Sequence, residues 1–311
     1  MININSKDPA FEISTTLSNH EFIEKIAISF EKKAKKKILY VNGEPINLKR
    51  QSDVKNYLIN FIFLTPQIEQ LFILGKSDRR HYLDKIVSDI DLTHSTRITN
   101  YQKLLKERLM IMQKYRGKKE GDAWVSVVEN NIVELGVAIA SARIEALDFF
   151  NKAIKSFPSN FPKTELRVIG EIEEKIGQES ALKIEEFYKA KLKANRTKDL
   201  ESFRTSFGVH RSDFDAIFLD KNMPATLCST GEQKAIMMSI TLSRAKISSS
   251  YKNLPTMLIF DEIVSHLDST RKTNLFEEII ATNLQAFFSA TSTDLIPEEF
   301  IDKNLIDIVK L

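Results

Sequence analysis

The C-terminal third of the chain alternates between segments of helical and of strand character. Apolar residues recur at helical spacing over residues 231–248 and 269–282, and short apolar runs cover residues 255–260 and 285–289. Strands that alternate with helices in this way are typical of a parallel sheet covered by its own crossover helices. The pattern therefore predicts an α/β fold and argues against an all-helical or all-β architecture for this part of the chain.

The earlier part of the chain predicts two further kinds of structure. Residues 10–64 contain short runs typical of strands and a helix near residues 52–58, whereas residues 77 to about 157 have helical periodicity. Residues 117–122 separate two long helices, about 95–116 and 123–156, which we expect to pair as an antiparallel hairpin roughly 30 Å long. Later runs predict strands at 165–172 and 216–219 and a helix at 179–195. The expected organisation is a β-rich part over 1–76, an inserted helical arm over 77–160 and an α/β part over 161–311.

The helical arm concentrates the positive charge of the chain. The whole chain has 45 basic and 42 acidic side chains, and this net charge of +3 does not by itself indicate a polyanionic partner. Between Arg97 and Lys119, however, eight basic residues face one acid, Glu107, which gives a net charge of +7. Such a segment fits a surface that contacts nucleic-acid phosphates, although a solvated helix face has the same composition. The candidate DNA contacts in the arm are Arg97, Lys103, Lys106, Arg108, Lys114 and Arg116.

Two carboxylates follow the apolar strand predicted over residues 255–260. Asp261 and Glu262 would lie at the carboxyl edge of a parallel sheet, where α/β proteins bind their ligands. In a nucleotide hydrolase with a Walker B strand, the first carboxylate, here Asp261, holds Mg²⁺, and the second, Glu262, orients or deprotonates the attacking water. Taken alone, a buried strand that ends in Asp-Glu also occurs without any catalytic role.

A second motif lies directly before the helix predicted over residues 231–248. The turn of Ser229, Thr230 and Gly231 offers a hydroxyl, free backbone N–H groups and the positive end of a helix dipole to a phosphate. A plain helix cap supported by Glu232 is the structural alternative. The turn resembles the signature of ATP-binding-cassette (ABC) proteins, and Asp268 stands where those proteins have the D-loop. The candidate nucleotide contacts are Ser229, Thr230, Gly231, Glu232, Gln233 and Asp268.

One motif of nucleotide hydrolases is absent from the printed sequence. No two of its nine glycines are five positions apart, so a P-loop, Gly-x-x-x-x-Gly-Lys-Ser/Thr, does not occur in it. A P-loop supplies the backbone cradle, the lysine and a Mg²⁺ ligand for the β and γ phosphates. We therefore expect this chain to bind ATP poorly in cis and to be deficient in hydrolysis on its own. Ser229 and Gly231 could still contact ATP held by an intact partner subunit.

These motifs together resemble those of the RecF family of bacterial recombination-mediator ATPases. The resemblance rests on Ser-Thr-Gly-Glu-Gln-Lys at 229–234, Asp-Glu-x-x-Ser-His-Leu-Asp at 261–268 and Gly-Val-His-Arg-Ser-Asp at 208–213. It extends to residues 75–84 and to Trp124, Gly136 and Arg143. Val209 and Ser212 depart from the family pattern, which has proline and aspartate there, and the chain begins after the strand and P-loop that open family members.

The resemblance implies an ABC-type ATPase head with an inserted helical arm, ATP and Mg²⁺ as cofactors, and an ATP-dependent homodimer in which each signature turn closes over the nucleotide of the other subunit. It also implies binding to single-stranded or gapped duplex DNA in replication, recombinational repair and the SOS response. The implied protein partners are RecR/RecO-type mediators and the RecA recombinase. Arg79 and Arg80 either touch DNA or pair with acids at the base of the arm.

Two other functions stay open at this point. One is a DNA-binding remnant of RecF without ATPase activity, and the other is a different short-armed ABC-type repair ATPase related to chromosome-maintenance (SMC) proteins.

The single cysteine, Cys228, excludes an internal disulfide framework and a multi-cysteine zinc site. No long uncharged apolar run and no signal-peptide pattern occurs, so we expect a cytoplasmic protein without a membrane partner.

Overall fold

The computed structural model describes residues 10–18, 23–31, 36–46, 60–115, 118–252, 256–282, 284–302 and 305–309. The chain divides into two compact units, Met1–Ile59 and Asn60–Leu311. The helix predicted near residues 52–58 lies outside the described residues. The boundaries expected at residues 76 and 160 fall inside the second unit, where the helical and α/β parts pack together, and the three-part organisation stays a prediction.

The first unit contains a four-stranded antiparallel sheet in the order β1-β2-β3-β4. Asn42 and Gly43 form a two-residue turn between β3 and β4 with φ values of 51° and 86°. A tight hairpin turn of type I′ requires positive φ at both positions, which Asn-Gly adopts readily. The short strands expected in this region are confirmed as β1 (Ala10–Ser18), β2 (Ile23–Glu31) and β3 (Lys36–Val41), whereas β4 (Glu44–Ile46) was not expected from the sequence.

The second unit is built around a parallel sheet of β5 (Asn60–Leu64), β9 (Thr256–Asp261) and β10 (Gln285–Ser289), in the order β10-β9-β5. Leu64 and Phe288 both lie opposite Phe260, so the three strands end at the same level. Since β5 precedes the helical arm in sequence and β9 follows it, the α/β layer is split by an insertion, as the sequence predicts. Ile62 and Leu258 face the core, whereas Phe61 on the opposite face is about half exposed.

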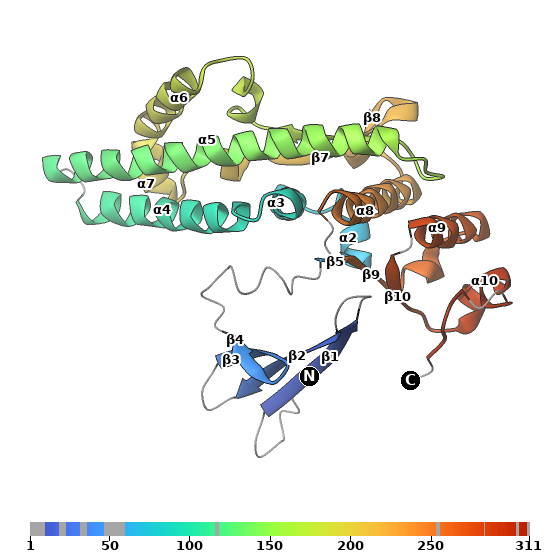
Figure 1. Ribbon diagram of the computed structural model, residues 1–311. Coiled ribbons are helices and arrows are strands. Elements are labelled where there is room, and N and C mark those ends of the chain that lie inside the picture. Colours follow the sequence, from blue (N-terminus) through green and yellow to red (C-terminus); the bar gives the residue numbers. More distant parts are fainter. Residues whose placement is uncertain are drawn as a thin grey trace. The chain divides into compact units, whose positions relative to one another are not determined.

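Helices make up most of the rest of the second unit (Figure 1). A second, antiparallel sheet has the order β6-β7-β8. No described helix is both long and apolar enough to span a bilayer. The remaining elements are α2 (Pro66–Glu69), α3 (Lys76–Ile90), α4 (His94–Lys114), α5 (Lys119–Ser156), β6 (Thr164–Ile169), η2 (Glu173–Lys175), α6 (Ala181–Ala194), α7 (Arg196–Ser202), η3 (Val209–Arg211), β7 (Asp213–Phe218), η4 (Leu219–Lys221), β8 (Met223–Pro224), η5 (Ala225–Leu227), α8 (Thr230–Lys252), η6 (Ile263–His266), α9 (Ser269–Thr282), η7 (Thr293–Leu295) and α10 (Glu298–Asp302).

The long helix α5 connects two hydrophobic clusters. Its N-terminal part pairs with α4 and contributes Val128 and Ile132 to a cluster shared with α4, α6 and the segment before β7. Its C-terminal part contributes Leu147 and Phe150 to the core around the parallel sheet. Figure 1 shows α4 and α5 extending side by side away from β9 and β10. The predicted antiparallel hairpin of two long helices is thus confirmed.

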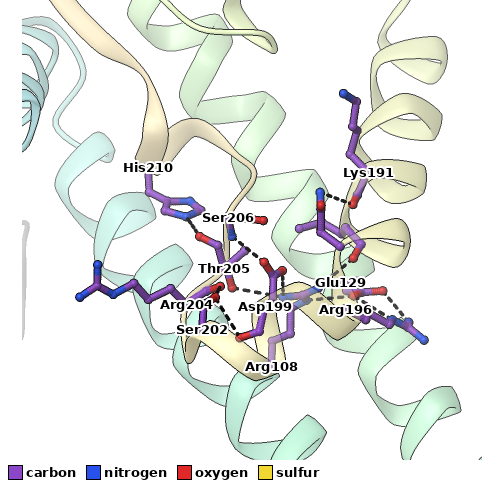
Figure 2. A network of polar contacts seen from close by, with 12 residues as sticks. Arg108, Glu129, Lys191, Arg196, Asp199, Ser202, Arg204, Thr205, Ser206 and His210 are labelled. Carbon is purple, nitrogen blue, oxygen red and sulfur yellow. Dashed lines mark hydrogen bonds and ion pairs between the residues drawn. The ribbon is translucent and has the colours of Figure 1, made fainter.

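A buried network of charged side chains joins the arm helices to α6 and α7 (Figure 2). Arg108 on α4 has no exposed side-chain surface and donates hydrogen bonds to Glu129 on α5, at 2.9 Å, and to Asp199 on α7, at 2.8 Å. It also donates to the Leu192 carbonyl of α6 and to the Thr205 hydroxyl. Because a buried cation needs compensating partners, this arrangement holds four helices in one relative position.

A chain of hydrogen bonds links α4 and α6 to residues 205–210. The His210 Nε2 lies 2.8 Å from the Thr205 carbonyl, and its Nδ1 lies 3.0 Å from the Tyr101 hydroxyl, which is 2.6 Å from the Tyr188 hydroxyl. Because a carbonyl only accepts hydrogen bonds, Nε2 carries the proton of a neutral His210 and Nδ1 is the acceptor. The Tyr101 hydroxyl therefore donates to Nδ1. It accepts in turn from the Tyr188 hydroxyl. Gly208 has a φ of 132°, and a Cβ there would come within 2.2 Å of the Tyr188 hydroxyl, so this packing requires glycine.

We predict that Arg108→Met lowers the free energy of unfolding by about 3–5 kcal/mol, because it leaves the buried carboxylates of Glu129 and Asp199 without their shared cation. Urea unfolding followed by circular dichroism measures the change. Lys106→Met on the exposed face of the same helix is the matched control and should change stability by less than about 0.5 kcal/mol. Equal effects of the two substitutions would contradict the structural role of Arg108.

We also predict that acid weakens the packing around His210. Burial lowers the pKa of His210 from 6.5 to about 4, so between these values the unfolded chain binds a proton that the folded chain does not. Stability should therefore fall as the pH decreases through this window, by up to about 3 kcal/mol, since one pKa unit corresponds to roughly 1.4 kcal/mol. The measurement is unfolding at pH 7 and pH 4.5 for the parent chain and for His210→Asn, which lacks this titration. The exposed His81→Asn control should keep the parent pH dependence.

Candidate functional site

The carboxyl edge of the parallel sheet carries the first group of candidate residues. Asp261 is the last residue of β9, and its Oδ1 accepts a hydrogen bond of 2.7 Å from Ser289 at the end of β10. The Ser289 hydroxyl in turn accepts from the Glu262 backbone N–H at 2.9 Å. Asp261 is exposed, and its Oδ2 has no hydrogen-bond partner among the described residues. One fixed carboxylate with a free oxygen fits Mg²⁺, which binds through one or two carboxylates, water and substrate phosphates.

Glu262 has an unusual backbone conformation. Its φ of 55° and ψ of 12° place a residue other than glycine in the left-handed region, where the side chain costs about 1–2 kcal/mol. The Ser265 hydroxyl donates to the Glu262 carbonyl at 2.6 Å and supports this turn. The exposed Glu262 therefore leaves the strand in a different direction from Asp261. Backbone strain of this kind is frequent at functional sites.

Gln67 is a further candidate ligand-binding residue at the same edge of the sheet. It was not predicted from the sequence. Leu64, the last residue of β5, lies opposite Phe260, so the residues after β5 and after β9 leave the sheet at the same level. Thr65 caps the short helix α2 by accepting from the Ile68 N–H, and Gln67 is exposed in that helix. Its position directly after an apolar strand, like that of Asp261, is the signal that could have identified it.

The signature turn forms the expected helix start. The Glu232 carboxylate accepts hydrogen bonds of 2.8 Å from both the backbone N–H and the hydroxyl of Ser229, which is the capping box named above as the structural alternative. Lys221, on the turn between β7 and β8, forms an ion pair with Glu232 and was not predicted from the sequence. The bonds from Lys221 and Ser229 lower the pKa of Glu232 to about 2. Gln233 is buried and donates to the Cys228 carbonyl at 3.0 Å.

Asp268 and the signature turn meet at Arg271. Asp268 caps α9 by accepting from the Arg271 backbone N–H at 2.8 Å, and the Arg271 side chain lies 3.5 Å from the same carboxylate. The Arg271 Nη1 is 3.8 Å from the position that a Cβ on Gly231 would occupy. The beginnings of α8 and α9 are thus adjacent, and the structure brings the signature and D-loop residues together.

The candidate DNA contacts on α4 separate into two groups. Lys103, Lys106 and Lys114 are exposed and follow one another at helical spacing on the outward face of the helix. Arg97 is half-buried and forms an ion pair of 2.6 Å with Asp91. Arg116 lies outside the described residues.

The prediction that Arg108 contacts DNA is wrong. Its side chain is completely buried between α4, α5 and α7, where two carboxylates neutralise it. The sequence did contain a signal: Arg108 is four residues from both Leu104 and Met112, which marks the inward face of α4. The net charge of the segment does not show on which side of α4 each basic residue lies.

The two arginines at the start of α3 also have partners inside the fold. Arg79 is buried and makes two hydrogen bonds of 2.8 Å to Asp213, so of the two alternatives for this residue the structure favours pairing with an acid. Arg80 donates to the Ser212 carbonyl at 2.8 Å. It also lines an open cleft of about 960 Å³ between α3, α4 and β5, which contains none of the residues predicted to bind nucleotide.

Motif residues that are distant in sequence converge on Arg143 of α5. Its buried guanidinium donates to both carboxylate oxygens of Asp84 on α3, to Glu173 in η2, at 2.9 Å, and to the Val209 carbonyl, at 2.8 Å. Burial raises the pKa of Asp84, but hydrogen bonds from His94 and Arg143 outweigh it and leave that pKa below its usual value. The 75–84 and 208–213 segments and Arg143, singled out separately in the sequence, thus form one cluster.

No family model matches this chain. It is 34% identical over 258 residues to the DNA replication and repair protein RecF of Brucella abortus (strain 2308), covering 81% of this chain and 66% of that protein. It is 36% identical over 254 residues to RecF of Rickettsia bellii (strain OSU 85-389), covering 81% and 68%. The matched region thus spans about two thirds of the length of these relatives.

Solved structures agree with the expected fold. A structure described as the recombination mediator protein RecF-ATPrS in the RecFOR pathway superimposes with a TM-score of 0.77 at 22% identity, covering 93% of this chain and 76% of that chain. A second, of RecF-ATP, gives a TM-score of 0.73 at 21% identity and covers 92% and 77%. The fold is therefore that of an α/β ABC-type ATPase head with an inserted helical arm. The identity and coverage of the sequence relatives show that the chain belongs to the RecF family of DNA replication and repair proteins.

Proposed function

We propose that this chain is a RecF-like recombination mediator that binds single-stranded or gapped DNA in an ATP-dependent manner. It would act in the cytoplasm, in replication, recombinational repair and the SOS response. The observation that carries the proposal is the presence, in one compact unit, of the signature turn, the D-loop and the Walker B carboxylates together with an arm whose α4 side is basic. RecR/RecO-type mediators and RecA are the partners that this function requires.

The proposed nucleotide contacts follow from the geometry of the signature turn and of the carboxyl edge of the parallel sheet. In an ATP-dependent homodimer, the N–H groups of Thr230 and Gly231 would face the phosphates of ATP held by the other subunit, and the Ser229 hydroxyl would donate to a phosphate in place of Glu232. Asp261 would hold Mg²⁺, which neutralises charge that develops on the phosphates, and Glu262 would orient the attacking water. Glu232 keeps the Ser229 turn in place, and Asp268 positions Arg271 beside Gly231.

The DNA contacts belong to the exposed face of α4. Lys103, Lys106 and Lys114 project from it at helical spacing, and none of the three forms an ion pair with another described residue. Surface cations in such a row can replace the counterions of successive phosphates. We therefore assign phosphate contacts to these lysines, with Arg97 and Arg80 at the base of the arm as further candidates.

A second function would use the same surface. Phosphate contacts by exposed lysines require no nucleotide, so a DNA-binding protein without ATPase activity of its own would use the same lysines while Asp261 and Glu262 serve no hydrolysis. The RecF relatives make an SMC-type repair ATPase the weaker alternative. ATP binding and DNA binding, measured separately, distinguish the two functions.

We predict that charge reversal of Lys103 and Lys106 to Glu weakens DNA binding at least tenfold at about 100 mM salt, because two phosphate contacts become repulsive. The dependence of log K on log salt should become shallower by about 2 units. Fluorescence anisotropy with a labelled gapped duplex measures both quantities. Reversal of the exposed Lys189 and Lys193 on α6 is the matched control and should leave affinity unchanged. Equal losses for both pairs would place the DNA surface elsewhere.

We predict that the 311-residue chain alone binds ATP with a Kd above about 1 mM, since the charge-assisted bonds of a P-loop, each about 1.5–3 kcal/mol, are missing from its sequence.

Mixed with RecF of Rickettsia bellii and ATP, the chain should form a mixed dimer detectable by sedimentation. Ser229→Arg should abolish this dimer, whereas Ser250→Arg, at the other end of α8, should not. Mixed dimers that tolerate Ser229→Arg would refute the trans role of the signature turn.

A further inference from the structure

The outward face of α5 near the end of the arm differs from that of α4 in both charge and hydrophobicity. All its side chains are exposed, and two of them are large and apolar: Trp124 is 51% exposed and Val127 is 58% exposed. We call this surface the α5 outer face, and it consists of Glu120, Ala123, Trp124, Val127, Asn130, Asn131 and Glu134. These positions share one side of the helix because they recur every three or four residues.

The apolar centre of the α5 outer face is preorganised. The Trp124 ring packs against the Tyr115 ring with a centroid separation of 5.6 Å and a tilt of 46°, so its position on the helix is supported from one side. Val127 lies one turn further along and has a restricted χ1 angle. Single exposed apolar residues are ordinary on protein surfaces, but a supported tryptophan beside an exposed valine is typical of a binding anchor.

The charge of the same face indicates what binds there. Glu120 and Glu134 are its only charged residues, and neither forms an ion pair with another described residue. They stand at opposite ends of the face, about 21 Å apart along the helix, so the apolar centre lies between two acids that no described cation neutralises. Such acids repel nucleic-acid phosphates and attract lysine and arginine, which commonly surround the apolar centre of a protein interface. The two sides of the hairpin therefore fit different partners.

The uncharged positions of the face suit the same kind of partner. Asn130 and Asn131 lie between Val127 and Glu134, and their exposed amides can both donate and accept hydrogen bonds. Ala123, one turn before Val127, is exposed and has only a methyl side chain. An apolar centre with a polar and charged surround is the usual arrangement of a protein–protein contact.

We propose that the α5 outer face binds a basic protein segment, in which a bulky apolar side chain packs on Trp124 and Val127 while lysines or arginines on either side pair with Glu120 and Glu134. A helical segment of about 15 residues has the length that joins the two glutamates. This inference goes beyond the proposed function and does not rest on it, because it needs neither ATP nor DNA. Trp124 would supply most of the contact area and the glutamates the selectivity for charge.

The test uses the full chain and a synthetic amphipathic helical peptide made of lysine and leucine. Trp124 is the only tryptophan, so its fluorescence reports on this face alone. Peptide binding should shift the emission to shorter wavelength, and anisotropy of a labelled peptide gives the affinity. At about 100 mM salt, Glu120→Lys/Glu134→Lys should weaken binding at least tenfold, and Val127→Ser alone at least threefold. The surface control Glu298→Lys/Glu299→Lys, equal in charge change, should leave the affinity unchanged.

Three results would overturn the proposal. The first is an equal loss of peptide affinity in the control variant, which would mean attraction to the overall charge. The second is a shift of Trp124 emission by a single-stranded oligonucleotide that Val127→Ser removes, which would mean that DNA is the occupant. The third is sedimentation of the chain alone as a dimer that Val127→Ser dissociates, which would mean that a second copy covers the face.

Discussion

The buried guanidinium of Arg143 is the interaction on which the arrangement of the second unit depends. It lies on α5 between the part that packs in the arm cluster and the part that packs on the parallel sheet. Burying a cation costs several kcal/mol unless its charge is compensated, and Asp84, Glu173 and the Val209 carbonyl accept four hydrogen bonds from it. Since these partners come from α3, η2 and η3, the direction of the arm is fixed at this point.

The same cluster explains one departure from the family pattern. The Ser212 hydroxyl donates a 2.7 Å hydrogen bond to Glu173 Oε1, the oxygen that also receives Arg143. An aspartate at 212 would bring a second carboxylate against Glu173 in a buried site, where like charges are unfavourable. Serine instead supplies a donor. Serine at position 212 is therefore compatible with the buried Glu173 carboxylate beside it.

Periodicity was sufficient to predict most helices and strands, because the buried faces of α4, α5 and α9 and the apolar run of β9 repeat at their own spacing. It also placed Asp261 and Glu262 at a sheet edge. It could not predict contacts between distant segments. Arg108 is neutralised by Asp199, 91 positions away, and the Lys221–Glu232 ion pair and the position of Arg271 near Gly231 exist only after β7, α8 and α9 have packed. Local sequence carries no information on such partners.

The contacts also form a continuous connection between arm and signature turn. Tyr101 on α4 forms a hydrogen bond with His210. The chain runs from His210 through β7 to Lys221, which forms an ion pair with Glu232. Glu232 in turn accepts a hydrogen bond from Ser229. The members of this connection differ in exposure: Tyr101 is buried and His210 is half-buried, whereas the Lys221 side chain is 54% exposed. Salt screens exposed ion pairs much more than buried ones. The conformation of the signature turn should therefore respond to ionic strength under conditions in which the packing of the arm does not change.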